Sequence, residues 1–124
     1  MDLQALKEKI QLWGRELGFQ QIGIADTDLR AAEADLKAWL EKGYQGQMKW
    51  MAAHGNKRYR PDALEPGTLR VISARMDYLP PDTQPVKILQ QKDKAYVSRY
   101  ALGRDYHKLI RKRLQQLAER IQQV

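Results

Sequence analysis

The sequence of 124 residues contains no cysteine. Without cysteine the chain forms no disulfide bond, offers no thiolate nucleophile and holds no zinc ion or iron–sulfur cluster through thiolates. It also lacks an apolar run of the roughly 20 residues needed to span a bilayer. Its first residues, MDLQALKEKI, have the periodicity and the acids of an amphipathic helix rather than of a signal peptide. We therefore expect a cytoplasmic protein without a membrane segment, in which any redox metal comes with a cofactor or from elsewhere.

The common catalytic motifs are absent as well. The chain has no GxxxxGK[ST] phosphate loop, no GxGxxG after a strand, no HExxH and no GxSxG. The two histidines, His54 and His107, are far apart in sequence, with no carboxylate cluster near either. A metal site held by the protein is therefore not expected.

Charge of one sign predominates, because 22 lysines and arginines face 15 acids and leave a formal net charge of +7. Such an excess favours anionic partners, although solubility alone would also explain it. The bases gather near the end of the chain: Arg99, Arg104, Lys108, Arg111, Lys112, Arg113 and Arg120. A smaller group consists of Lys57, Arg58 and Arg60. This distribution makes a freestanding basic RNA-binding module one hypothesis, with a merely solvated helix face as its alternative.

Apolar periodicity predicts helices that alternate with short strands. Three helices are expected over residues 3–17, from about residue 29 to 42, and over residues 109–121. Gly18 and Gly43 are placed to end the first two helices, and Thr27 and Asp28 offer N-cap oxygens to the second. Three strands are expected, at residues 19–25, 69–79 and 95–100. The predicted class is α/β or α+β, a small sheet flanked by helices in a single incomplete domain over residues 1–124, the front piece of a longer protein.

The segments between these elements differ in character. Residues 44–54 predict a short helix whose Met48, Trp50 and Met51 belong to the core rather than to a cofactor site. Proline and glycine break the chain after it, at residues 61–67, and KILQQKDK, residues 87–94, is polar enough for a mobile loop.

Two stretches carry the candidate site. In NKRYRPDALEPG the proline after Arg58 holds the loop in one shape, so that the arginine can present its planar group to a carboxylate, amide or phosphate. In SRYALGRDYH, residues 98–107, a strand would place Ser98 and Tyr100 on one side and Arg99 on the other.

A turn and a helix start would follow that strand. Gly103 permits the turn, Asp105 can cap the last helix, and Tyr106 and His107 would lie in its first turn, near the end of the strand where ligands tend to bind in α/β proteins.

These stretches, with ELGFQQIGIADTDL and GTLRVISARMDYLP in the same order, resemble the N-terminal region of epoxyqueuosine reductases. The resemblance extends over essentially the whole chain. It implies an enzyme that reduces the epoxide of epoxyqueuosine in the anticodon stem-loop of tRNA, using cobalamin and two [4Fe-4S] clusters. It also implies a nitroreductase-like cobalamin domain followed by a ferredoxin-like module and helical repeats, in a monomeric enzyme.

The resemblance suggests roles for individual residues. Arg58 and Ser98 match positions that contact cobalamin, and Asp105 and Tyr106 match polar positions on the substrate side of the pocket. Arg99 and Tyr100 are close competitors for substrate contact. The proton-donating aspartate and the cysteines of both clusters are expected beyond Val124, so no catalytic residue is assigned and the isolated chain is expected to be inactive. A flavin nitroreductase is a weaker third hypothesis.

Overall fold

The computed structural model describes residues 2–124, which form two compact units. One unit comprises the chain up to Ile22 together with residues Ala74–Val124, and the other comprises Gly23–Ser73. A single incomplete domain over residues 1–124 therefore stays a prediction. The described residues contain both helices and a small sheet, which confirms the α+β class. No helix among them is long and apolar enough to cross a membrane.

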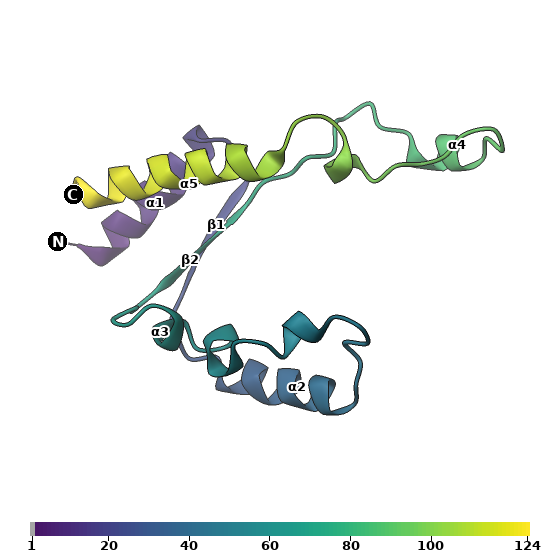
Figure 1. Cartoon of the computed structure of the whole chain (residues 1–124). Coiled ribbons are helices and arrows are strands. Elements are labelled where there is room, and N and C mark those ends of the chain that lie inside the picture. Colours follow the sequence, from purple (N-terminus) through teal and green to yellow (C-terminus); the bar gives the residue numbers. More distant parts are fainter. Residues whose placement is uncertain (1) are drawn as a thin grey trace. The chain divides into compact units, whose positions relative to one another are not determined.

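The first unit is built on two helices, α1 (Leu3–Glu16) and α5 (Tyr106–Gln122), which lie side by side (Figure 1). Among residues 2–124, the buried hydrophobic side chains all belong to this unit: Ile10, Phe19, Ile22 and Leu117. Arg120 donates a hydrogen bond of 2.5 Å to Glu16, which joins the two helices at the surface. Apolar contact thus holds α1 against α5, and an ion pair joins them at the surface.

The end of α1 follows the sequence prediction. Gly18 has a φ of +89°, the left-handed conformation that glycine adopts without steric cost. A β-carbon at this position would lie 2.5 Å from the guanidinium Nη1 of Arg113 on α5. Gly18 therefore both ends the helix and leaves room for an arginine of the neighbouring helix.

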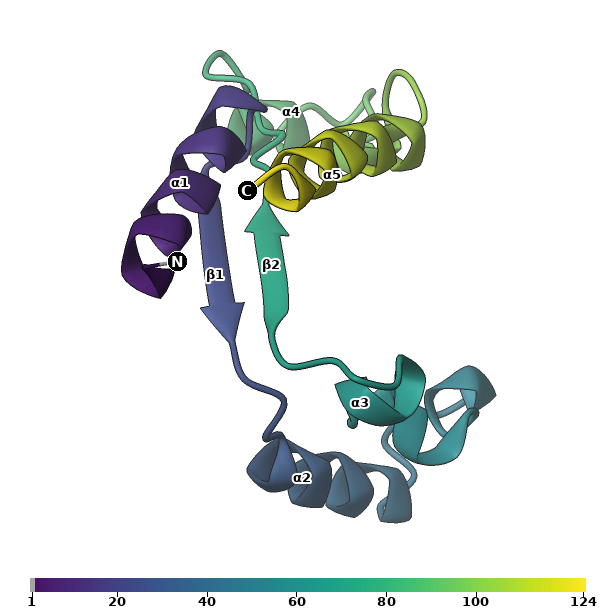
Figure 2. The ribbon, with the colours of Figure 1, turned by 90° about the vertical axis from the view of Figure 1, so that its left-hand side faces the viewer.

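The sheet has two strands, β1 (Gln21–Ala25) and β2 (Val71–Arg75), which pair antiparallel (Figure 2). The prediction of a third strand at residues 95–100 was wrong. Those residues run without regular structure into a 3-10 helix, Arg99–Ala101. A strand needs a neighbour with which to pair, and β-propensity in Tyr96 and Val97 does not supply one.

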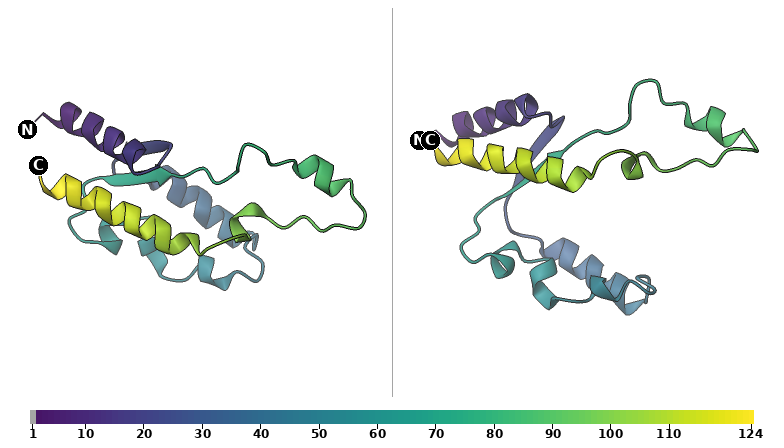
Figure 3. Two further views of the ribbon diagram at one scale, coloured as in Figure 1. Left: turned by 90° about the horizontal axis from the view of Figure 1, so that it is seen from above. Right: turned by 45° about the horizontal axis from the view of Figure 1, so that its top comes forward.

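Between β2 and α5 the chain makes a long excursion with the short helix α4 (Pro85–Leu89) at its far end (Figure 3). The prediction of a mobile polar loop at residues 87–94 was wrong in its first part, because α4 includes Lys87, Ile88 and Leu89. Pro85 stands in the first turn of this helix, where its missing N–H costs nothing.

The second unit contains α2 (Arg30–Glu41), two 3-10 helices (Lys49–Met51 and Gly55–Arg58) and α3 (Pro61–Leu64). Leu29, not Thr27 or Asp28, is the N-cap residue of α2. Asp28 nevertheless accepts hydrogen bonds from the backbone N–H and the guanidinium of Arg30. These bonds lower the pKa of Asp28 to about 2, the side-chain hydrogen bond from Arg30 contributing most.

The segment after α2 differs from its prediction. Only Lys49–Met51 are helical, as a 3-10 turn. The expectation that Met48 and Trp50 belong to the core was wrong, since they are 43% and 58% exposed. The exposure of Trp50 is unusual, since tryptophan is highly buried on average.

Candidate functional site

The stretch SRYALGRDYH forms a 3-10 turn, a glycine turn and a helix start. Ser98 precedes the 3-10 helix and is exposed, and Gly103 turns the chain with a φ of +82°. Asp105 is the N-cap of α5, its carboxylate accepting a 2.9 Å hydrogen bond from the backbone N–H of His107. The predicted glycine turn, N-cap and first-turn positions of Tyr106 and His107 are confirmed, whereas the strand before them is not.

Asp105 and His107 form a second contact through their side chains. The imidazole Nδ1 lies 2.9 Å from the same carboxylate oxygen of Asp105. The His107 side chain, followed by its backbone N–H, lowers the pKa of Asp105. Asp105 is therefore a carboxylate near neutral pH, an acceptor of hydrogen bonds rather than a donor of protons.

Aromatic rings extend this arrangement. The ring of Tyr106 stacks on that of His107, with centroids 4.1 Å apart and an angle of 24° between the planes. Tyr100 meets Tyr106 edge to face, with centroids 6.3 Å apart. Such pairs are favourable beyond their buried area, so the three rings support one another's positions.

A hollow of about 440 Å³ lies beside these rings. Three residues proposed from the sequence line it, namely Arg99, Tyr100 and Tyr106, and Arg99 is held by a 3.1 Å hydrogen bond from its Nη2 to the hydroxyl of Thr83. Ser98 and Asp105 are not among its lining residues. The sequence prediction thus identified one side of the hollow.

The sequence prediction missed the remaining lining residues: Met76, Tyr78, Leu102, Arg104 and Ile110. Met76 and Tyr78 directly follow β2, and the end of a strand is a place where ligands bind in α/β sheets. The sequence prediction extended this strand to residue 79 and so placed both residues within it, whereas the strand ends at Arg75. The resulting hollow is mainly aromatic and apolar with two arginines, the usual composition of a site for an organic ligand.

Arg58 belongs to the second unit, in the 3-10 helix Gly55–Arg58. Its Nη2 donates a 2.8 Å hydrogen bond to the backbone carbonyl of Trp50, and its guanidinium lies 5.4 Å from the centre of the Trp50 ring. Together with His54, Lys57 and Leu64 it lines a hollow of about 470 Å³. Pro61 begins the short helix α3 three residues later, where the sequence predicted a loop.

The loop that carries Arg58 is tied to α2 by an ion-pair cluster. Glu33 accepts hydrogen bonds from Lys37 at 2.6 Å and from Arg60 at 3.2 Å. Lys37, followed by Arg60, lowers the pKa of Glu33. Both cations also lie over the ring of Tyr59, at 5.3 and 6.0 Å. Residues 58–60 are therefore held from two sides, by Trp50 and by α2.

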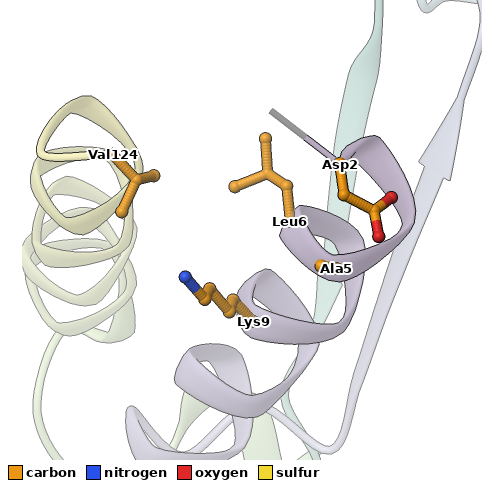
Figure 4. A pocket seen from close by; sticks show the side chains of 5 residues that line it. All are labelled: Asp2, Ala5, Leu6, Lys9 and Val124. Carbon is orange, nitrogen blue, oxygen red and sulfur yellow. The ribbon is translucent and has the colours of Figure 1, made fainter.

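A further hollow, of about 300 Å³, lies between the start of α1 and Val124, which follows α5 (Figure 4). Leu6 and Lys9 of α1 point toward Val124 in this view. None of the site residues proposed from the sequence lines it. Among residues 2–124, no group of three or more histidine, aspartate or glutamate side chains is arranged to hold a metal ion.

Residues 58–124, more than half of the chain, match a family model described as epoxyqueuosine reductase QueG, DUF1730. The chain is 68% identical over 121 residues to a protein named epoxyqueuosine reductase in Pseudomonas aeruginosa, covering 98% of the chain and 34% of that protein. Proteins of the same name in Salmonella typhimurium and Escherichia coli are 60% and 59% identical over 123 residues, covering 99% of the chain and 32% of each protein. The chain thus spans about a third of the length of these curated relatives. No solved structure gives a significant match.

Proposed function

Because the chain belongs to the epoxyqueuosine reductase family, we propose that it is the N-terminal segment of a reductase that converts epoxyqueuosine in tRNA to queuosine. One observation carries this proposal: 68% identity over 98% of the chain to the Pseudomonas aeruginosa enzyme. The relatives described above all carry the reductase name, which favours this function over a freestanding RNA-binding module.

We propose cobalamin as the cofactor, with two [4Fe-4S] clusters bound elsewhere in the enzyme, since this chain has no cysteine. We further propose that the domain around the cobalamin is nitroreductase-like. Arg58 keeps N–H groups beyond the one donated to Trp50, and Ser98 has an exposed side chain, so each can bind an amide or phosphate of a large polar-edged cofactor. Bound cobalamin would supply the two-electron reduction.

The aromatic hollow of the first unit suits the substrate. Tyr100 and Tyr106 offer rings and hydroxyl groups to the modified base, and Arg99 offers a cation. Asp105 does not line this hollow, but as a carboxylate held by His107 it can accept hydrogen bonds from substrate hydroxyl groups. Since Asp105 is ionised, the proton that opens the epoxide would come from another group, in line with a proton donor beyond Val124.

A chimera tests the proposal. The chain would replace the matching segment of the Pseudomonas aeruginosa reductase, and the chimera would be expressed in an Escherichia coli strain that lacks its own reductase. Mass spectrometry of tRNA nucleosides should show queuosine where the parent strain accumulates epoxyqueuosine, because the segment differs in fewer than a third of its positions.

The Pseudomonas aeruginosa enzyme in the same strain is the positive control. If that enzyme forms queuosine and the chimera, present in equal folded amount, leaves only epoxyqueuosine, the proposed function is wrong. Ser98→Ala and Arg58→Ala variants of the chimera should take up less cobalamin, measured by the visible absorption of the purified protein.

A further inference from the structure

A basic segment without acids runs through the second unit. Residues 42–60 contain five lysines and arginines and no aspartate or glutamate. The cations are Lys42, Lys49, Lys57, Arg58 and Arg60. Glu33, which lies outside the segment, forms an ion pair with Arg60. The segment is therefore a local concentration of positive charge, suited to an anionic partner.

Two aromatic rings in this segment, those of Tyr44 and Trp50, are exposed and lie under cations. The side chain of Trp50 is 58% exposed, although tryptophan is usually well buried. Arg58 holds it, with its guanidinium 5.4 Å from the ring centre and a 2.8 Å hydrogen bond to the Trp50 carbonyl. Tyr44, 63% exposed, has the ammonium group of Lys42 5.8 Å from its ring centre. A tryptophan held in place while most of its surface is open is ready to stack on a planar partner.

The hollow that Arg58 lines contains further basic side chains. His54, Lys57 and Arg58 line it with Leu64, and its volume of about 470 Å³ is ample for a phosphate group. His54 has a φ of +68° and is the one non-glycine residue with positive φ among residues 2–124. Such backbone strain is concentrated at binding and catalytic sites. Arg58 connects this hollow to the exposed ring, because it lines the hollow and its guanidinium also lies over Trp50.

We propose that Trp50 and this hollow bind an unpaired stretch of the tRNA substrate, one base stacking on Trp50 and an adjacent phosphate lying between His54 and Lys57. Single-stranded nucleic acid is bound in this way, by aromatic platforms beside a basic groove. An acidic peptide would use the cations but would leave the exposed ring without a stacking partner. The inference rests on the proposed function, which makes tRNA the substrate.

The test uses the chimeric reductase and a fluorescent anticodon stem-loop RNA, with binding followed by anisotropy. Trp50→Ala should weaken binding roughly 5- to 150-fold, the range for losing one base–aromatic stack. Trp50→Phe should keep most of the affinity, because a benzyl ring still stacks. Lys57→Gln should reduce the slope of log K against log salt by about 1, the value for one lost phosphate contact.

Matched variants control for general effects. Leu69→Ala removes an exposed apolar side chain of the same unit that does not line the hollow, and Lys87→Gln removes an exposed charge from α4 in the other unit. Both should bind the stem-loop as the unchanged chimera does. A fully paired RNA duplex of equal length should respond less to Trp50→Ala than the stem-loop does, since it has no unpaired base to stack.

RNA and cobalamin both carry a phosphodiester, so either could bind in this hollow. Cobalamin uptake, measured from the visible spectrum of each variant, distinguishes the two ligands. If Trp50→Ala and Lys57→Gln leave RNA affinity unchanged, or lower cobalamin uptake instead, the inference is wrong. A chimera that binds the stem-loop through Trp50 but forms no queuosine would contradict the proposed reductase function while leaving the RNA site standing. If the chimera and its Trp50→Ala variant form queuosine equally well, the RNA site would be contradicted while the proposed reductase function would stand.

Discussion

At the scale of single residues, short-range hydrogen bonds decide which groups are charged and where helices begin. Asp105 shows this most clearly, because one carboxylate oxygen serves both the backbone N–H and the imidazole of His107. The same atom therefore caps α5 and orients a ring that stacks on Tyr106. The ionisation of Asp105 therefore affects both the stability of α5 and the hydrogen bonds that we propose between Asp105 and the substrate.

Replacing Asp105 should make stability depend on pH in a defined way. The folded pKa of Asp105 is lowered by His107, so its contribution to stability is present above the unfolded pKa and is lost as pH falls through the folded value. Asp105→Ala should lower the melting temperature near neutral pH, and the difference from the unchanged chain should shrink in strong acid. Thermal unfolding followed by circular dichroism measures both.

Asp105→Asn provides the matched comparison. Asparagine caps helices about as well as aspartate but carries no charge. It should keep most of the stability near neutral pH and should lose the acid-dependent part. An unchanged difference between Asp105→Ala and the parent chain across the whole pH range would contradict the assignment of the cap to the ionised carboxylate.

At the scale of elements, the first unit depends on the contact between α1 and α5. Leu117 on α5 is 3% exposed and Ile10 on α1 is 4% exposed, whereas the other large apolar side chains of these helices are half-buried or exposed. A core with so few fully buried side chains relies heavily on each of them. The two helices also carry Glu16 and Arg120, whose surface ion pair adds little.

Two substitutions on the same helix should separate buried from exposed leucines. Leu117→Ala should reduce the free energy of unfolding by about 2–5 kcal/mol, the usual cost of removing a buried leucine side chain. Leu114→Ala should cost less than about 1 kcal/mol, because Leu114 is already 40% exposed. Urea unfolding of both variants gives the comparison. Equal losses would show that α5 does not pack through the face that carries Leu117.

At the scale of the whole molecule, the net charge of +7 is unevenly distributed. Lys108, Arg111 and Lys112 are exposed on α5, and Lys57 and Arg58 line a hollow of the second unit. If tRNA is the partner, the number of phosphates contacted should depend on how many of these exposed cations face the tRNA, and not on the net charge alone.

The dependence of tRNA binding on salt tests this view. Replacing Lys108, Arg111 and Lys112 by glutamine in the chimera should reduce the slope of log K against log salt by about 2 to 3, at about 0.9 per lost contact. Replacing Lys87, Lys92 and Lys94 removes the same charge from the excursion before α5 and should change the slope by less than about 1. Equal changes of the slope in the two triple variants would mean that the cations of α5 contribute only through the net charge of the protein and not through phosphate contacts.

The sequence by itself determined what depends on neighbours along the chain. Gly18, Gly43 and Gly103 take positive φ values where the sequence placed helix ends and a turn, and Asp105 caps the helix that it precedes. These features need only a few adjacent residues, so local chemistry is sufficient to predict them. Membership of the reductase family likewise followed from ordered local motifs.

Tertiary structure decided what depends on residues distant in sequence. A strand needs a partner, and residues 95–100 have none among residues 2–124, so their β-propensity was not expressed. Met76 and Tyr78 join the hollow of Tyr100 and Tyr106 only because β2 ends beside the start of α5. Trp50 is open to solvent under Arg58 for the same reason: burial is a property of the surroundings that a side chain finds, and a linear pattern does not contain it.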